Sequence, residues 1–163
     1  MISPLLANIY LHEVLDAWFV SEVRPRLRGR AVLIRYADDF VVLFADRDDA
    51  RRVLDVLPKR FGKYGLTLHP DKTRLVPFRR PDIAGSRGEE GPGTFDLLGF
   101  THYWAVSRRG KWIVKQRTAK DRFSRTLRRI REWCRRYRHA PVDAQHIALV
   151  RKLRGHYGYY GIT

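Results

Sequence analysis

Apolar positions in the first half of the chain follow a helical period, then a strand period, then a helical period again. Residues 3–23 and 48–64 place apolar side chains three or four positions apart, and Gly65 follows the second segment as a helix stop. Between them, residues 29–46 hold two runs rich in β-branched residues around a short polar stretch. The pattern predicts a helix, a β-hairpin and a second helix.

Short strands and two long helices are predicted for the second half. Residues 79–94 are rich in glycine and proline and are expected to form a flexible loop. The apolar runs on either side predict strands at 66–68, 73–78, 95–105 and 111–117. Helical spacing predicts helices at 121–138 and 142–157. Hairpins mixed with helices indicate an α+β fold class.

The helix predicted at 121–138 has apolar residues on one side and arginines on the other. The apolar side is expected to face inward, and it comprises Phe123, Leu127, Ile130, Trp133, Cys134 and Tyr137. We therefore expect Trp133 and Tyr137 to be core residues, not platforms on which nucleic-acid bases stack.

Charge divides the chain into two regions. Its 163 residues include 33 Lys and Arg against 17 Asp and Glu, a net charge of +16, while a hydrophobic share of 44% excludes a disordered basic tail. Residues 111–163 hold 15 of the basic residues and only 3 of the acidic ones. Such a surplus favours a polyanionic partner, although arginine rows on a helix are also common on solvated faces.

Several other classes of protein fit this sequence poorly. Charges interrupt every candidate membrane span and no signal peptide is evident, so we expect a cytoplasmic protein with no membrane partner. The single cysteine, Cys134, allows no internal disulfide. The six histidines are scattered without the spacing of metal ligands, which argues against a zinc site.

Two adjacent aspartates, Asp38 and Asp39, stand near the turn of the predicted hairpin. Neighbouring carboxylates repel each other unless a cation neutralises them. Magnesium takes one or two carboxylates and completes its shell with water and substrate phosphates, so this pair suits part of a nucleotide site. The alternative is a merely polar turn, because aspartate is a common turn residue.

Four segments, in this order and spacing, resemble motifs of group II intron reverse transcriptases, also called intron-encoded maturases. They are Ser-Pro-Leu-Leu-Ala-Asn-Ile-Tyr-Leu at 3–11, Arg-Tyr-Ala-Asp-Asp-Phe at 35–40, Gly-Leu-Thr-Leu-His-Pro-Asp-Lys-Thr at 65–73 and Phe-Asp-Leu-Leu-Gly-Phe at 95–100. Residues 108–161 resemble the thumb, or maturase, region of the same family. The resemblance covers nearly the whole chain.

The resemblance implies a partial polymerase palm, an antiparallel sheet backed by helices, followed by a basic helical thumb segment. Four regions result. They are a palm at 1–78, a flexible loop at 79–94, a primer-support hairpin at 95–117 and partial thumb or maturase helices at 118–163. Within the hairpin, Gly99 would permit close approach of a backbone or form a strand bulge.

By the same resemblance, the activity is RNA-directed DNA synthesis with two magnesium ions, on a primer and RNA template with deoxynucleoside triphosphates. Asp38 and Asp39 match the metal-binding aspartates of the family. Tyr36 matches a tyrosine beside the primer end, and its alternative is an aromatic residue packed on the core. Lys72 matches a lysine that could steady triphosphate charge or donate a proton, and its alternative is a solvated lysine.

Phosphate contacts are expected from the basic region. The candidates at the tip of the predicted hairpin are Arg108, Arg109 and Lys111. Further candidates on the following strand and helix are Lys115, Arg117, Arg125, Arg128 and Arg129. Affinity for nucleic acid would then fall steeply as salt rises.

The sequence departs from the family at its N-terminal side, where an earlier strand with another metal-binding aspartate and the fingers region are expected. We therefore expect a truncated fragment that is inactive alone, with apolar runs exposed at 32–34 and 41–44 unless a separate N-terminal piece supplies the rest. The leading hypothesis is a reverse transcriptase fragment. The alternative is a non-catalytic RNA-binding maturase remnant that assists intron splicing.

Overall fold

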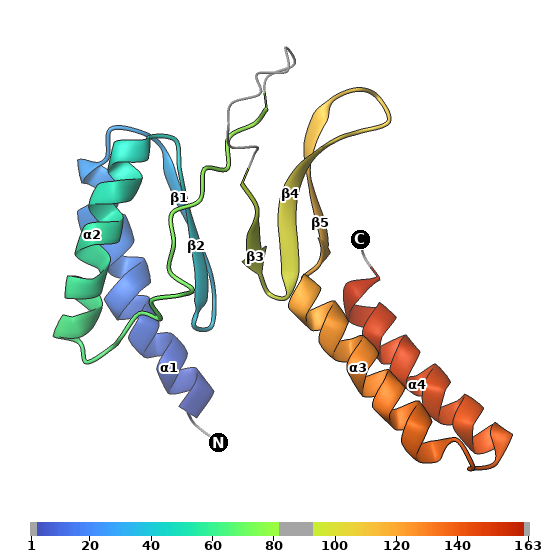
Figure 1. Cartoon of the computed structure of the whole chain (residues 1–163). Coiled ribbons are helices and arrows are strands. Elements are labelled where there is room, and N and C mark those ends of the chain that lie inside the picture. Colours follow the sequence, from blue (N-terminus) through green and yellow to red (C-terminus); the bar gives the residue numbers. More distant parts are fainter. Residues whose placement is uncertain (1–2, 82–92, 162–163) are drawn as a thin grey trace. The chain divides into compact units, whose positions relative to one another are not determined.

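The computed structural model describes residues 3–81 and 93–161, and it divides the chain into two compact units. Unit 1 comprises Met1–Val76 and unit 2 comprises Pro77–Thr163. Each unit combines helices with an antiparallel sheet (Figure 1). The expected α+β class is confirmed.

Unit 1 begins with one continuous helical segment, as predicted for 3–23. It starts as α1 (Ser3–Leu11), widens into the π-helical turns η1 (His12–Ala17) and η2 (Phe19–Val23), and ends in the 3₁₀ turn η3 (Arg24–Arg26). The buried side chains of the segment are Val14 and Leu15 in η1, Phe19 and Val23 in η2, and Trp18 between these two turns.

The predicted hairpin follows, with strands β1 (Ala31–Tyr36) and β2 (Asp39–Phe44). The strands pair antiparallel, from Ala31 opposite Phe44 to Tyr36 opposite Asp39. Only two residues, Ala37 and Asp38, connect them, so the two aspartates lie at the tip of a tight turn.

Helix α2 (Arg47–Lys63) follows the hairpin, and its limits agree with the predicted helix at 48–64. The Asp46 side chain caps its first turn by accepting a hydrogen bond of 2.8 Å from the Asp49 backbone N–H. At the other end Gly65 adopts φ +67°, the left-handed conformation in which helices commonly end at glycine.

The core of unit 1 lies between the helices and one face of the hairpin. Side chains of the helical segment, among them Leu15 and Phe19, meet Val53, Leu57 and Phe61 of α2. Alternate hairpin residues pack against this cluster, namely Leu33, Phe40, Val42 and Phe44. Because neighbouring strand residues face opposite sides, the pleat decides which apolar side chains are buried.

The other face of the hairpin is exposed, which corrects the expectation of continuous exposed runs at 32–34 and 41–44. Val32, Ile34 and Leu43 are 40%, 46% and 41% exposed. Leu33 between them packs on the core. The exposure alternates because a strand has a period of two.

A buried carboxylate joins the chain before β1 to the start of α2. Asp49 accepts hydrogen bonds of 2.8 Å from the backbone N–H groups of both Arg28 and Gly29, and it forms an ion pair with Arg52. The Gly29 N–H, with help from Arg52 and Arg28, holds the pKa of the Asp49 carboxyl below its usual value.

The strands predicted at 66–68 and 73–78 are wrong. The turn between them forms, because the backbone N–H groups of Lys72 and Thr73 donate to the His69 carbonyl at 3.2 and 3.0 Å. On its N-terminal side, Leu66 and Leu68 pack against the core of unit 1. Apolar packing thus holds residues 66–68, and neither predicted strand has the ladder of backbone hydrogen bonds that would make it one.

Unit 2 contains the sheet β3 (Phe95–Leu97), β4 (Phe100–Val106) and β5 (Trp112–Thr118), paired antiparallel in that order. The single strand predicted at 95–105 is therefore wrong, because a two-residue turn at Leu98 and Gly99 divides it. Both turn residues have positive φ, +53° and +80°. Leucine is not a typical residue for this conformation, so the sequence pattern concealed the turn.

Most of the loop predicted at 79–94 lies outside the described residues.

Tyr159 and Tyr160 pack on this turn. The Tyr159 hydroxyl donates to the Leu98 carbonyl at 2.9 Å, and the Phe100 and Tyr159 rings stack with centroids 5.4 Å apart. A Cβ atom on Gly99 would lie 2.9 Å from the Tyr160 hydroxyl oxygen. Gly99 is thus a turn residue approached closely by a side chain, and the bulge alternative is wrong.

Two antiparallel helices, α3 (Lys120–Tyr137) and α4 (Val142–Tyr160), follow β5 (Figure 1). The inward placement predicted for the apolar side of α3 is wrong for Phe123, Leu127, Cys134 and Tyr137, which are exposed. Ile130 and Trp133 are half-buried. A two-helix hairpin covers only one side of each helix, which leaves the rest of the apolar stripe in solvent. Within the described ranges, no helix is long and apolar enough to cross a membrane.

The buried Asp49 carboxylate predicts a defined acid sensitivity. Its pKa in the folded chain lies below the usual value of 3.8, so the stability it supplies is present above that value and is lost as pH falls through the folded pKa. We expect Asp49→Asn to lower the urea midpoint at pH 7 and to flatten its decline between about pH 5 and about pH 2. The control Asp55→Asn, at an exposed position of α2, retains the parent acid profile. Equal acid profiles for the parent and Asp49→Asn would contradict this assignment.

Candidate active site

The aspartate pair lies on an exposed, tight turn. Asp38 occupies the second central position of the turn and Asp39 is the first residue of β2. Both side chains are exposed. Ala37, at the first central position, has φ +53°, a left-handed conformation that costs a non-glycine residue about 1–2 kcal/mol. The turn is therefore strained where it presents the two carboxylates.

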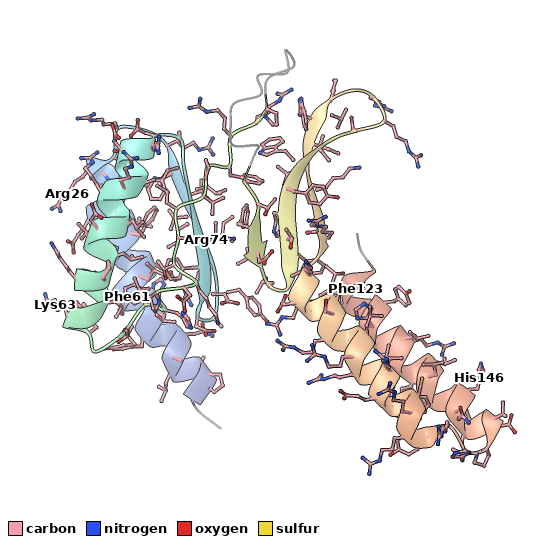
Figure 2. The ribbon with its side chains drawn as sticks, in the orientation of Figure 1. Arg26, Phe61, Lys63, Arg74, Phe123 and His146 are labelled. Atoms are coloured by element: carbon pink, nitrogen blue, oxygen red, sulfur yellow. The ribbon has the colours of Figure 1, made fainter. Side chains whose placement is uncertain are left out.

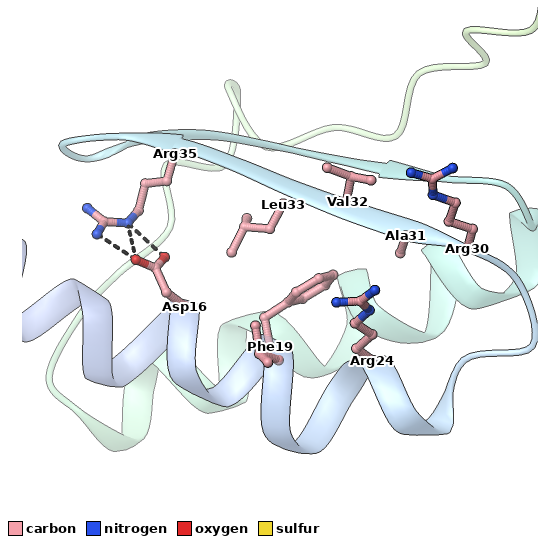
Figure 3. Close-up of a pocket in the computed structure, with 9 residues that line it drawn as sticks. Asp16, Phe19, Arg24, Arg30, Ala31, Val32, Leu33 and Arg35 are labelled. Carbon is pink, nitrogen blue, oxygen red and sulfur yellow. Dashed lines mark hydrogen bonds and ion pairs between the residues drawn. The ribbon is translucent and has the colours of Figure 1, made fainter.

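An arginine from β1 contacts this strained residue. The Arg35 Nη1 atom donates to the Ala37 carbonyl oxygen at 2.8 Å and to the Asn8 Oδ1 atom of α1 at 3.0 Å. The other side of the guanidinium is held by Asp16, with Nε 2.8 Å from Oδ1 and Nη2 2.7 Å from Oδ2 (Figure 3). The N-terminal helical segment is thus linked to the turn through Arg35.

The electrostatics of this pair are mutually reinforcing. The hydrogen bond from Arg35 lowers the pKa of Asp16, with a smaller contribution in the same direction from His12. The hydrogen bond to Asp16 in turn raises the pKa of Arg35. The Arg35 side chain is 13% exposed and that of Asp16 is 25% exposed, so both partners stay charged in a largely desolvated pair.

An open groove of about 370 Å³ runs along β1 beside this ion pair (Figure 3). Its apolar wall includes Phe19 and Val20 of the helical segment, and Arg24 and Arg30 add positive charge. Asp38 and Asp39 lie outside it. The carboxylate pair therefore faces solvent at the turn, and the groove is a separate feature of unit 1.

The donor set at the turn fits magnesium. Carboxylate oxygens are the ligands this ion prefers, and it keeps several waters and binds substrate phosphates beside one or two carboxylates. In the described part of the chain, no group of three or more His, Cys, Asp or Glu side chains gathers around a common point. Asp38 and Asp39 can thus supply two ligands of an open site.

Tyr36 and Lys72 were also predicted as site residues. Tyr36 is 67% exposed, so the alternative that it packs on the core is wrong, and it is the residue directly opposite Asp39 in the hairpin. Lys72 is exposed in the turn after His69. Among the described residues it forms no ion pair with Asp38 or Asp39.

The predicted nucleic-acid contacts form two exposed groups in unit 2. Arg108, Arg109 and Lys111 surround the β4–β5 turn, while Lys115 and Arg117 lie two residues apart on one face of β5. The Arg117 guanidinium carbon lies 5.2 Å from the centre of the Tyr103 ring.

The second group lies on α3, from which many nitrogen-tipped side chains project (Figure 2). Arg128 and Arg129 follow Arg125 by three and four residues and all three are exposed, so each of the two later arginines neighbours Arg125 on the helix surface. Arg125 lies 3.8 Å from Asp121, an exposed ion pair of little energetic weight. The basic charge of α3 is therefore largely available to a partner.

Comparison with known families decides the class of the protein. A model described as reverse transcriptase (RNA-dependent DNA polymerase) matches residues 1–102. The chain belongs to the reverse transcriptase family. The matched region contains all of unit 1, with the Tyr-Ala-Asp-Asp turn, and the β3–β4 turn of unit 2. The mixed architecture with antiparallel sheets agrees with part of a reverse transcriptase palm. A search of curated proteins found no match.

Sequence reasoning missed the supporting residues of the reverse transcriptase turn. Asn8 and Arg35 lie inside the quoted motifs, but their spacing predicts only that one is on a helix and the other on a strand. It does not predict a contact between them. Asp16 stands among the apolar positions of the first helix. Two features of the sequence could have indicated this pair. Arg35 stands two residues before the turn, and Asp16 is an acidic residue within a predicted helix that must pack against the hairpin.

The strain at Ala37 predicts a stabilising substitution. Ala37→Gly removes the left-handed penalty and is expected to raise the free energy of unfolding by about 1 kcal/mol, measured by urea denaturation. The control Ala7→Gly, at an exposed position within α1, is expected to lower it by about 0.5–1 kcal/mol. A loss of stability in Ala37→Gly would show that the turn does not hold its left-handed conformation in solution.

Proposed function

We propose that this chain carries the catalytic turn of a group II intron-type reverse transcriptase, which adds deoxynucleotides to a primer on an RNA template. The observation that carries the proposal is the exposed Asp38–Asp39 pair, presented at the tip of a hairpin within the region that matches the reverse transcriptase family. A purely structural turn has no need of two adjacent exposed carboxylates on a strained backbone.

Asp38 and Asp39 would hold magnesium, two ions in the complete enzyme. When bound, magnesium neutralises the triphosphate and favours in-line attack by the primer hydroxyl. The exposed Tyr36, opposite Asp39 in the hairpin, would be available to pack against a nucleotide or the primer end. Lys72 is the candidate for a contact with the triphosphate. We propose that binding of the substrate brings Lys72 close to Asp38 and Asp39.

The group II assignment rests on the four ordered motifs and on the basic second unit. Its exposed arginines on α3 and around the β4–β5 turn suit contacts with the phosphates of a template, a primer or intron RNA. We propose that another polypeptide segment completes the metal site, since two ligands from one turn position an ion less firmly than ligands from two elements. A misplacement of about 1 Å can cost about a hundredfold in rate.

The proposal predicts that the purified chain does not extend a primer by itself. Extension of a labelled primer on an RNA template is expected only when a second polypeptide, with the fingers and further metal-binding aspartate of a group II intron reverse transcriptase, is added. Asp38→Asn in this chain should abolish that restored extension, whereas the exposed α2 variant Asp55→Asn should retain it.

The outcomes separate the two parts of the proposal. Extension by the chain alone that is lost in Asp38→Asn would refute its inactivity and support its chemistry. Restored extension that is insensitive to Asp38→Asn would refute the catalytic assignment of the turn.

A second candidate function is RNA binding without catalysis, as a maturase that assists intron splicing. The charge of residues 111–163, with 15 basic and 3 acidic residues, favours it. It needs only unit 2, and it is compatible with an inactive aspartate turn.

RNA binding through α3 predicts a steep dependence on salt. The logarithm of the affinity for a structured RNA should fall linearly with the logarithm of salt concentration, by about 0.9 per duplex phosphate contact or about 0.7 per single-stranded contact. Replacing Arg125, Arg128 and Arg129 by glutamine should reduce the slope by about 2–3. Arg51→Gln with Lys59→Gln on α2 is the control, for which we expect a smaller change. An unchanged slope in the α3 variant would exclude this surface.

A further inference from the structure

The Arg35 guanidinium donates hydrogen bonds to three partners, whereas an ion pair with Asp16 alone would need only one. Nε and Nη2 form a two-pronged contact with the Asp16 carboxylate, at 2.8 and 2.7 Å. This contact leaves both hydrogens of Nη1 for other acceptors. One goes to Asn8 Oδ1 at 3.0 Å and the other to the Ala37 carbonyl at 2.8 Å. All three nitrogens of the side chain are therefore used.

The hydrogen bond from Arg35 to the Ala37 carbonyl bears directly on the turn. Its carbonyl belongs to the peptide group that joins Ala37 to Asp38, so a hydrogen bond to this oxygen restrains the orientation of that peptide. Restraining the peptide restrains the backbone on both sides, namely the left-handed Ala37 and the residue that carries the first carboxylate. Strained backbone of this kind persists only when its surroundings determine it.

The anchor of the guanidinium lies on another element. Asn8 belongs to α1 and Asp16 to η1, and the helical segment that contains them is fixed by the buried Leu15, Trp18 and Phe19. Arg35 is thus held from a rigid helix while it contacts the turn two residues ahead of it. Its limited exposure, 13%, protects these hydrogen bonds from competition with water.

We propose that Arg35, anchored by Asp16 and Asn8, is a positioning residue that holds the Ala37–Asp38 peptide and thereby presents Asp38 and Asp39 as a metal-binding pair. The metal-binding part of this inference rests on the proposed function. Lysine cannot replace arginine here, because a single ammonium group cannot grip Asp16 at two points and also reach the Ala37 carbonyl.

The test uses the full chain with two measurements. The chemical shifts and three-bond couplings of Ala37 report how much of the turn is left-handed, and titration with Mn²⁺ alone reports the metal affinity. For Arg35→Lys we expect a loss of the left-handed signature and about tenfold weaker Mn²⁺ binding, since residues that orient metal ligands typically contribute about 10- to 100-fold. Arg30→Lys, at the exposed residue just before β1, is the matched control and should equal the parent.

Two further variants separate positioning from general stability. Asn8→Ala removes one partner of Nη1 from an exposed site on α1, and it is expected to produce a smaller change of the same kind, which keeps the test open if Arg35→Lys does not fold. Adding Ala37→Gly to Arg35→Lys should restore much of the Mn²⁺ affinity, because glycine adopts the left-handed turn without penalty. A plain loss of an ion pair would not be rescued at Ala37.

The outcomes are decisive for each part. If the Arg35→Lys and Asn8→Ala variants both retain the left-handed signature of Ala37, the positioning role is wrong. If Asp38→Asn and Asp39→Asn bind Mn²⁺ as tightly as the parent, the metal site in the proposed function is wrong, while the signature of Ala37 still decides whether Arg35 holds the turn.

Discussion

The ion pair between Asp16 and Arg35 links the two parts of unit 1 on which the candidate site depends. The helical segment supplies a rigid, buried wall, and the hairpin supplies the exposed turn with its two carboxylates. A two-stranded sheet has little stability of its own, so the face packed against Leu15, Phe19 and α2 keeps it ordered. Arg35 extends that order to the turn, where packing can no longer reach.

The two units present surfaces of different chemistry. Unit 1 concentrates negative charge at one turn, next to an exposed tyrosine, which suits cations and the nucleotides they accompany. Unit 2 exposes most of its arginines along α3 and around the β4–β5 turn, which suits the phosphates of nucleic acid. The match to the reverse transcriptase family, over residues 1–102, includes the carboxylate turn of unit 1, and the basic surface of α3 lies beyond it.

Sequence patterns predicted the secondary structure best where a residue type strongly prefers one backbone conformation or one side of an element. The helical period located α2 and α4, Gly65 marked the end of α2, and the Tyr-Ala-Asp-Asp tip placed the β1–β2 turn. They were wrong at Leu98, where a leucine adopts a conformation that glycine or asparagine usually takes. They were also wrong for α3, because amphipathic spacing indicates an apolar side but not whether another element covers it.

The sequence by itself determined the α+β class, the carboxylate pair and the basic surplus, because periodicity, adjacent residue types and charge are local properties of the chain. Only the tertiary structure decided that Arg35 reaches the Ala37 carbonyl while Asp16 and Asn8 hold it, and that the Gly99 turn lies under Tyr160. Arg35 and Ala37 are only two positions apart, but the anchors of Arg35 lie 19 and 27 positions away at Asp16 and Asn8, and Tyr159 lies 61 positions from Leu98. No local pattern specifies such pairs, since packing in three dimensions brings their hydrogen-bonding groups within reach.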